Sequence, residues 1–426
     1  MLAAVLALQV AQQGPYPVFD TDLLPASEYA ARRGKLFHAL PKGSVAVAFT
    51  NPVRNRNNDV DYEFRADSDF LYMTGFTEPN AAVVMCADGI TVDGKTANVW
   101  LLLDPPNPTA LTWTGYRMGD EGAKRVLGLD ALPYARFKDV MEAVAGKPMV
   151  GGMVQEGANG GLAEMAKLLP VGKRPDLAPY VAELRWVKSP AEIALLRKAA
   201  DASVQGHLLA EKAVKPGVHE YDLEAVAEMG FKRAGCEDVG YPSIVGGGEN
   251  SCILHYESNR RLLKDGDVVC MDAAGEYHGY SADVTRTFPV SGRFSPEQKA
   301  IHDLVLDAQN AGIAQCRPGM PFRAPHDAAT KVIAAGLKRL GIISDDKEVR
   351  RYFMHGTSHP IGLDVHDAMP KDTTLQPGVV LTVEPGIYIR EGSPTDKRWW
   401  NIGCRIEDDI LVTPNAPVNL SGALPR

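Results

Sequence analysis

The sequence has no apolar run long enough to span a bilayer as a helix, no cluster of basic residues and no closely spaced pair of cysteines. The first absence excludes a helical membrane-embedded protein, which needs about 20 consecutive apolar residues. Without basic clusters, and with a formal net charge of -8, the chain offers a phosphate backbone little to bind, so nucleic acid is not an expected partner. With 426 residues, 45% hydrophobic and 23% charged, the composition fits a globular protein of two or three domains.

The six cysteines are scattered, and most lie inside apolar runs where a thiol behaves as a small hydrophobic side chain. We therefore expect them to be reduced, which favours a cytoplasmic location. The first residues, "MLAAVLALQVAQQ", form a short apolar run with alanines at candidate cleavage positions but with no basic segment before it. Residues 1–15 are accordingly expected to be a tail or the remnant of a signal, and export is the alternative location.

The first half of the chain, residues 16–187, alternates strand-like and helix-like patterns. A helix is predicted over "ASEYAARRGKLFHAL" (26–40). Three apolar runs predict buried strands: "GSVAVAF" (43–49), "AAVVMCA" (81–87) and "ANVWLLL" (97–103). The fold class that follows is mixed α/β (α+β), beginning with an N-terminal α/β domain.

The second half, residues 188–426, contains an internal repeat. "SPAEIALLRKAADASV...KPG...EMGFKRAG" runs from Ser189 to Gly235, and "SPEQKAIHDLVLDAQN...RPG...AAGLKRLG" runs over the same length, 47 positions, from Ser295 to Gly341. Each copy opens with Ser-Pro, which suits the N-cap and first position of a helix, and each copy predicts a helix pair. Two strand-like runs follow each pair, so we expect two α-α-β-β units related by a pseudo-twofold axis.

Four acidic residues occupy matched positions in the two copies. Asp272 and Glu384 each stand six positions after the glycine that opens the first strand, and Asp283 and Glu407 lie in the second strand. Buried carboxylates that lie close together repel one another and are costly unless cations neutralise them. Two divalent ions would balance four carboxylates, and His359 in "FMHGTSHPIGLDVHD" is the expected neutral ligand.

A helical zinc pair of the HExxH kind, formed by His355 and His359, is the alternative for this segment. Gly356 stands where that motif has its glutamate base, and Pro360 with Gly362 opposes continuation of a helix, so we reject it. Carboxylates with one imidazole favour Mn²⁺, Co²⁺ or Zn²⁺. Two such ions about 3.5 to 4 Å apart share and activate a water, so the expected chemistry is hydrolysis.

Five segments of the second half, in their order along the chain, resemble the pita-bread metallopeptidases, most closely the Xaa-Pro aminopeptidase (aminopeptidase P) family: "ILHYESN", "MDAAGEYHGYSADVTRTFPVSGRF", "FMHGTSHPIGLDVHD", "VLTVEPGIYI" and "GCRIEDDILVT". The resemblance continues into the first half through "FRADSDFLYMTGFTEP" (64–79) and "TWTGYRMGDEGA" (112–123). It implies an aminopeptidase P-type N-terminal domain over residues 16–187 and a duplicated pita-bread catalytic domain over residues 188–426.

The resemblance further implies a dinuclear metal site, typically with manganese. Its ligands would be Asp272, Asp283, His359, Glu384 and Glu407, with Asp283 and Glu407 bridging the two ions. Glu384 is also the implied general base toward the metal-bridged water that attacks the scissile carbonyl. Mn²⁺ is the first expectation, with Co²⁺ or Zn²⁺ as alternatives.

Four more residues receive roles from the resemblance. His255 and His366 would bind the substrate and either stabilise the tetrahedral intermediate or protonate the leaving amine. Arg405, two residues before Glu407, would orient the carboxylates and so serve catalysis indirectly. Trp113 would help to bind the substrate and close the site, often on a neighbouring subunit, which implies a homodimer or homotetramer.

The activity expected from these residues is removal of the N-terminal residue from peptides with proline in second position. Prolidase, which shares the five ligands and cleaves only Xaa-Pro dipeptides, is the nearest alternative, but "YESNRRLLKDGD" lacks the glycine-rich form typical of prolidases. A non-catalytic pita-bread binding protein is a third hypothesis, and the complete ligand set argues against it. Pro360 and "AMPKDTT" depart from the family pattern near the substrate cleft, which bears on substrate range rather than on metal binding.

Overall fold

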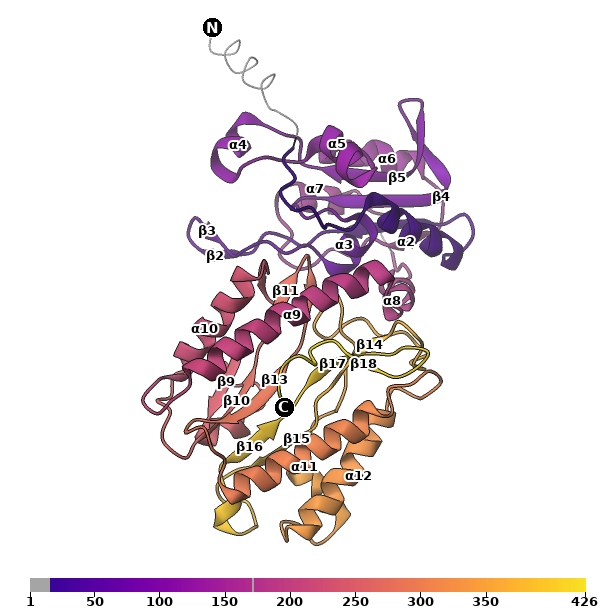
Figure 1. Cartoon of the computed structure of the whole chain (residues 1–426). Coiled ribbons are helices and arrows are strands. Elements are labelled where there is room, and N and C mark those ends of the chain that lie inside the picture. The colour runs from indigo at the N-terminus through magenta and orange to yellow at the C-terminus, as the bar shows by residue number, and fades with distance from the viewer. Residues whose placement is uncertain (1–15, 171) are drawn as a thin grey trace. The chain divides into compact units, whose positions relative to one another are not determined.

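The computed structural model describes residues 16–170 and 172–426. It divides into two compact units, one reaching to Leu184 and the other running from Arg185 to Arg426 (Figure 1). The expected tail or signal remnant at residues 1–15 lies outside the described residues. Among the helices of the described ranges, none combines the length and the hydropathy that crossing a bilayer requires.

The first unit is built around a five-stranded mixed sheet with the strand order β6-β5-β4-β1-β7. The central strand β4 is antiparallel to both β1 and β5, whereas β7 and β6 run parallel to β1 and β5 at the edges. The strands are β1 (Val45–Phe49), β4 (Ala82–Val92), β5 (Lys95–Leu103), β6 (Asp130–Pro133) and β7 (Met149–Gly151). The three predicted apolar runs are therefore the three central strands, which confirms the prediction.

Helices and one small hairpin complete this unit. The predicted helix is α2 (Ala26–Ala39). Val84 and Trp100 of the sheet share a core cluster with Phe137 and Leu162, so the helices that carry those two residues pack against the sheet. The remaining elements are β2 (Asn55–Asn57), β3 (Val60–Asp61), α3 (Ser68–Thr74), α4 (Pro108–Thr114), α5 (Gly119–Gly122), η1 (Ala123–Leu127), η2 (Tyr134–Arg136), α6 (Phe137–Ala143) and α7 (Gly160–Lys167). The helix α8 (Ala178–Trp186) begins in this unit and ends two residues past its last residue.

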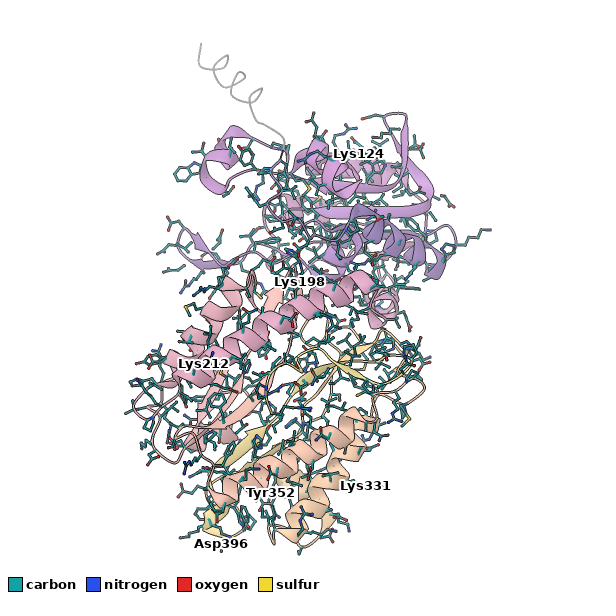
Figure 2. All side chains as sticks on the ribbon, viewed as in Figure 1. Lys124, Lys198, Lys212, Lys331, Tyr352 and Asp396 are labelled. Carbon is teal, nitrogen blue, oxygen red and sulfur yellow. The ribbon has the colours of Figure 1, made fainter. Side chains whose placement is uncertain are left out.

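The second unit contains the two predicted helix pairs, α9 (Pro190–Ala213) with α10 (Glu220–Arg233) and α11 (Pro296–Ile313) with α12 (Ala324–Arg339). Ser189 and Ser295 cap α9 and α11 with complete capping boxes, as predicted. Within the first pair, Gly206 and Gly230 face each other so closely that a Cβ on Gly230 would lie 2.7 Å from the Gly206 Cα. The exposed lysines Lys198, Lys212 and Lys331 mark the solvent side of these helices (Figure 2).

The strands of the second unit form two similar hairpins, and each arm of each hairpin is broken into two pieces. In the first copy, β10 (Val268–Asp272) pairs with β13 (Thr285–Pro289), and β11 (Gly275–Tyr277) pairs with β12 (Tyr280–Ser281). In the second copy, β14 (Val380–Val383) pairs with β17 (Asp408–Leu411), and β15 (Gly386–Ile389) pairs with β16 (Ile402–Arg405). Shorter elements are β8 (Asp238–Val239), β9 (Ile244–Gly247), η3 (Gly248–Cys252), η4 (Asp346–Arg351), η5 (Lys397–Trp399) and β18 (Val418–Asn419).

All four predicted acids stand at these breaks. Asp272 ends β10, Glu384 directly follows β14, and Asp283 and Glu407 lie in the gaps that precede β13 and β17. The expectation that Asp283 and Glu407 lie within continuous strands was therefore wrong. The physical reason is that the break frees backbone groups for contacts between the two copies: the Glu407 N–H donates to the Thr285 carbonyl at 3.1 Å. The breaks thus join the two hairpins at their acidic residues.

Each copy also buries a hydrophobic core of its own. Leu223 and Phe231 of α10 pack in one cluster with Met271 of β10, and Ile301 and Leu337 of the second helix pair share another with residues of β15 and β16. The six cysteines are all buried and all free, as predicted. The acids therefore lie between two separately packed halves of one unit.

Candidate metal centre

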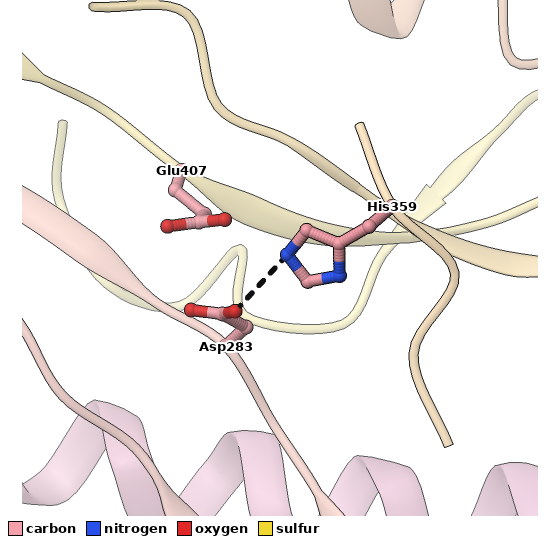
Figure 3. A group of neighbouring side chains, drawn as sticks. All are labelled: Asp283, His359 and Glu407. Atoms are coloured by element: carbon pink, nitrogen blue, oxygen red, sulfur yellow. Dashed lines mark ion pairs between the residues drawn. The ribbon is translucent and has the colours of Figure 1, made fainter. Parts of the chain in front are cut away.

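Three of the predicted ligands meet at one point. Asp283, His359 and Glu407 each offer one ligand atom, and these atoms all lie within 4.8 Å of one another (Figure 3). The Nε2 atom of His359 is 3.3 Å from Oδ2 of Asp283. Asp283 and Glu407 are buried and His359 is nearly so. The group comes from both copies of the repeat, because Asp283 precedes β13 whereas His359 and Glu407 belong to the second copy.

Backbone contacts fix the direction of the His359 ring. The backbone N–H of His359 donates to the Thr382 hydroxyl at 3.1 Å, and the Thr382 N–H donates to the His359 carbonyl at 2.9 Å. Strand β14 therefore holds the segment that carries His359. Nδ1 of His359 donates to the Pro360 carbonyl at 3.1 Å. Since that bond occupies Nδ1, Nε2 is the nitrogen left facing the acids and available to a cation. The segment is not helical, which agrees with the rejection of a helical zinc pair.

Glu384 and Asp272 complete the set around this centre. Oε1 of Glu384 lies 3.7 Å from His359 Nε2. The Tyr241 hydroxyl lies 2.5 Å from Oδ1 of Asp272 and 2.7 Å from Oδ1 of Asp283, so its single proton is within hydrogen-bond distance of two of the acids. All five residues that the resemblance implied as ligands therefore surround a single centre.

Electrostatics show how unfavourable this cluster is for unneutralised carboxylates. Burial raises the pKa of Glu384 to about 7 against the lowering effect of the His359 charge, and the Asp283 charge adds to the rise. Burial, followed by the charges of Asp283 and Glu384, also raises the pKa of Glu407 well above its usual range. Burial opposes protonation of His359, but the hydrogen bond and charge of Asp283 outweigh it and raise the pKa of His359 to about 9.

The residues at this centre fit a divalent cation. Oε1 of Glu407 is buried and has no hydrogen-bond partner in the part of the chain that the structure describes, while Oε2 accepts from the Thr285 hydroxyl at 2.6 Å. Four carboxylates and one imidazole form an oxygen-rich donor set suited to hard or borderline ions rather than to thiolate-bound zinc. A cation would give the bare Glu407 oxygen a partner and relieve the repulsion that raises the acid pKa values.

Arg405 lies where the sequence placed it, beside the acids. Nη2 of Arg405 donates to Oδ2 of Asp272 at 2.6 Å, and Nε donates to the Thr285 hydroxyl at 3.1 Å. Because that hydroxyl in turn donates to Glu407, the guanidinium orients one acid directly and a second through Thr285. Its third contact is the Tyr388 hydroxyl, at 3.0 Å from Nη1.

The predicted substrate-binding residues differ in their surroundings. The ring of His366 is stacked on that of His359, with centroids 3.8 Å apart and 14° between the planes. Burial, and then the charge of His359, lowers the pKa of His366 to about 4. His255 is exposed on the loop after η3. Trp113 lies on α4 of the first unit with 81% of its side chain exposed, and its role in binding substrate stays a prediction.

Two residues at the centre were missed by sequence reasoning. One is Tyr241, which has no spacing signal in "GYPSIV". The other is His355, which the sequence suggested only as half of a zinc pair. Its Nδ1 is 3.5 Å from Oε2 of Glu384, and its Nε2 accepts from the Tyr388 hydroxyl at 2.9 Å. Burial, and then the Arg405 charge, lowers the pKa of His355 to about 4, so the ring is neutral near pH 7. His355 also lines a pocket of about 920 Å³.

His278 lies away from the centre. It occupies the two-residue turn between β11 and β12, where His278 and Gly279 have φ values of 49° and 81°, as a type I′ hairpin turn requires. Its Nδ1 is 2.6 Å from Oε1 of Glu237, an ion pair outside the acidic cluster. His278 therefore offers a natural control for substitutions at the centre.

Comparisons with known proteins agree with this geometry. Residues 194–414 match the model of metallopeptidase family M24, and residues 29–150 match that of the aminopeptidase P N-terminal domain. The Xaa-Pro aminopeptidase of Escherichia coli (strain K12) is 36% identical over 424 residues, which covers 93% of this chain and 95% of that protein.

Solved structures give the same result. Pseudomonas aeruginosa aminopeptidase PepP is similar with a TM-score of 0.87 and 35% identity, over 95% of this chain and 97% of that one. The E. coli aminopeptidase P with the inhibitor Pro-Leu has a TM-score of 0.87 and 34% identity, over 95% and 96% of the two chains. The chain thus belongs to metallopeptidase family M24, within its Xaa-Pro aminopeptidase (aminopeptidase P) group, and is a metal-dependent aminopeptidase with a pita-bread catalytic domain.

Proposed function

We propose that this enzyme hydrolyses the bond between an N-terminal residue and a penultimate proline, with two divalent ions, Mn²⁺ first, held by Asp272, Asp283, His359, Glu384 and Glu407. The convergence of four carboxylates, three of them buried, and one imidazole from both copies of the repeat carries the proposal. When bound, such a metal pair lowers the pKa of a shared water and polarises the scissile carbonyl. The preference for proline is supported by the similarity to Xaa-Pro aminopeptidases, one of which binds the inhibitor Pro-Leu.

The chain's own residues supply the remaining steps. Glu384 takes the proton of the attacking water, since its carboxyl group lies at the centre beside His359 and His355. The leaving group is the ring nitrogen of proline, which has no N–H in the peptide and must gain a proton to depart. His366, stacked on His359, and His255 are the proposed binding residues and proton donors for that nitrogen.

The decisive test is the release of the first residue from Xaa-Pro-Yaa tripeptides by chelator-treated protein reloaded with Mn²⁺, Co²⁺ or Zn²⁺. Matched Xaa-Ala-Yaa peptides serve as the control and should resist cleavage. Activity confined to Xaa-Pro dipeptides would replace the proposal with prolidase. Protein that binds no divalent ion after loading would replace it with a non-catalytic binding role.

We also propose domains at residues 16–187 and 188–426, a homodimer or homotetramer in which Trp113 helps to close the site, and a cytoplasmic location. Light scattering on the purified protein tests the oligomer, and a raised KM for Trp113→Ala tests the tryptophan. The intact mass of the mature protein tests whether the segment at residues 1–15 is removed on export.

A further inference from the structure

Glu220 is a buried acid outside the metal centre. It stands at the start of α10 and is 0% exposed. The nearby guanidinium of Arg261 pairs with Asp267 and Glu249 instead, and among the described residues Glu220 forms no ion pair. A carboxyl group so placed must be satisfied by hydrogen bonds alone.

Four hydrogen bonds reach Glu220, and all come from one short stretch of chain, residues 247–261. Oε1 and Oε2 each accept two of them, so both oxygens are fully used. The donors are Gly247 N at 2.7 Å, Asn250 Nδ2 at 3.1 Å, Arg261 N at 2.8 Å and the Tyr256 hydroxyl at 2.9 Å. Because these groups lie at both ends and in the middle of the stretch, Glu220 closes it into a fixed loop.

This loop carries His255. The side chain of His255 is exposed, whereas its neighbour Tyr256 is turned inward by the bond to Glu220. A second buried anchor, Asn259, has a φ of 47° and bonds with both its amide atoms to Val245 N and Ser243 O on the β9 side. Between η3 and Leu262, the loop belongs to no helix or strand, so these side chains set its course.

We propose that Glu220 is a positioning residue for His255: by fixing the 247–261 loop from beneath, it holds the imidazole where substrate is bound. The inference rests on the proposed function, in which His255 contacts the substrate. The four partners of the Glu220 carboxylate are all donors that belong to the loop, so its effect on the reaction passes through the loop.

Glu220→Gln is the sharpest probe, because the amide has the same shape but one of its two polar atoms donates. In either orientation a buried backbone N–H, of Gly247 or of Arg261, then faces another donor. With Mn²⁺ and an Xaa-Pro-Yaa substrate, kcat/KM should fall at least tenfold while the bound metal content is unchanged. The control is Glu228→Gln, the same charge change on the same helix, whose partner is the Ser243 hydroxyl; it should stay within twofold.

A double-mutant cycle separates positioning from general damage. In a His255→Ala background, Glu220→Gln should cause no further loss, whereas an equal loss in both backgrounds would overturn the inference. Tyr256→Phe removes one of the four bonds and should follow the same pattern more weakly, which keeps the test available if Glu220→Gln fails to fold. Wild-type protein inactive on these peptides would instead overturn the proposed function, and an unchanged His255→Ala would overturn the role of His255.

Discussion

His359 and Asp283 face each other across the two copies of the repeat, with Nε2 and Oδ2 3.3 Å apart. With its raised pKa, the imidazolium is the counter-ion of the acids whenever no metal ion is bound. A divalent cation must take over that role and displace the proton, so metal binding and proton release are coupled at this centre. Hydrogen bonds from neighbouring residues hold the acidic side chains in position for the cation, and substitutions at these residues test that role.

Glu384→Ala should lower kcat by at least about 10³-fold, because it removes both a proposed ligand and the proposed general base. His278→Ala is the matched control: that imidazole pairs with Glu237 in a hairpin turn, and its loss should leave kcat within twofold. Both are measured with the Xaa-Pro-Yaa assay after Mn²⁺ loading. Similar losses in the two variants would show that the site is misplaced.

Tyr241→Phe should weaken metal binding about tenfold, since the hydroxyl holds Asp272 and Asp283 toward the centre and outer contacts of this kind tune ligand geometry. Calorimetric titration of the metal-free protein with Mn²⁺ measures the effect. Tyr280→Phe serves for comparison, because its hydroxyl donates to Glu192 at 3.0 Å rather than to a centre acid. An affinity equal to that of the wild type in both variants would contradict the role of Tyr241.

Asp367→Asn should reduce the free energy of unfolding by about 3 to 5 kcal/mol, because it strands the buried charges of Lys188 and Arg185. The Lys188 and Asp367 side chains are each 1% exposed, with Nζ 2.9 Å from Oδ2. Asp364→Asn is the matched variant: Asp364 shares Arg185 but is 42% exposed, so the cost should stay below about 1 kcal/mol. Urea unfolding compares them, and equal losses would contradict the argument from burial.

His207 should make the second unit sensitive to acid. Burial lowers the pKa of this fully buried imidazole to about 4, against about 6.5 in an unfolded chain. Between these values only the unfolded state binds the proton, so the stabilising contribution is complete above pH 6.5 and is lost as pH falls toward 4. From pH 7 to pH 5 the wild type should lose about 2 kcal/mol more unfolding free energy than His207→Gln. Identical pH dependence in urea titrations would contradict this.

Much of the fold could be predicted from local signals in the sequence. Ser189 and Ser295 each begin a helix because the serine hydroxyl and the side chain three residues later cap each other's backbone N–H, whatever packs against the helix. The matched spacing of Asp272 and Glu384 marked the acids because duplication repeats a position as well as a residue type. These features depend on neighbours in the chain, and a sequence displays them directly.

The contacts that sequence reasoning missed depend on partners distant in the chain. Tyr241 bonds to Asp283 over 42 residues of chain, and His355 bonds to Tyr388 over 33, so each contact forms only when distant segments have folded together. The strand breaks at Asp283 and Glu407 were hidden for the same reason, since they allow contacts with the other copy. The Glu407 N–H donates to the Thr285 carbonyl, and the Asp283 N–H donates to the Asp409 carboxylate. In the sequence, an apolar run with a central acid has the same pattern whether it forms one continuous strand or two strands with a break between them.

Asp272 and Asp283 belong to one copy of the repeat, and His359, Glu384 and Glu407 belong to the other. A cation bound by these residues would link the two copies, and separation of the hairpins would remove ligands from that cation. With the proposed ligands, only the docked state would offer the complete set, and a bound cation should then stabilise this unit against unfolding in proportion to the logarithm of the cation concentration over the dissociation constant. Enzymatic activity and the free energy of unfolding of this unit should then rise together as the cation binds.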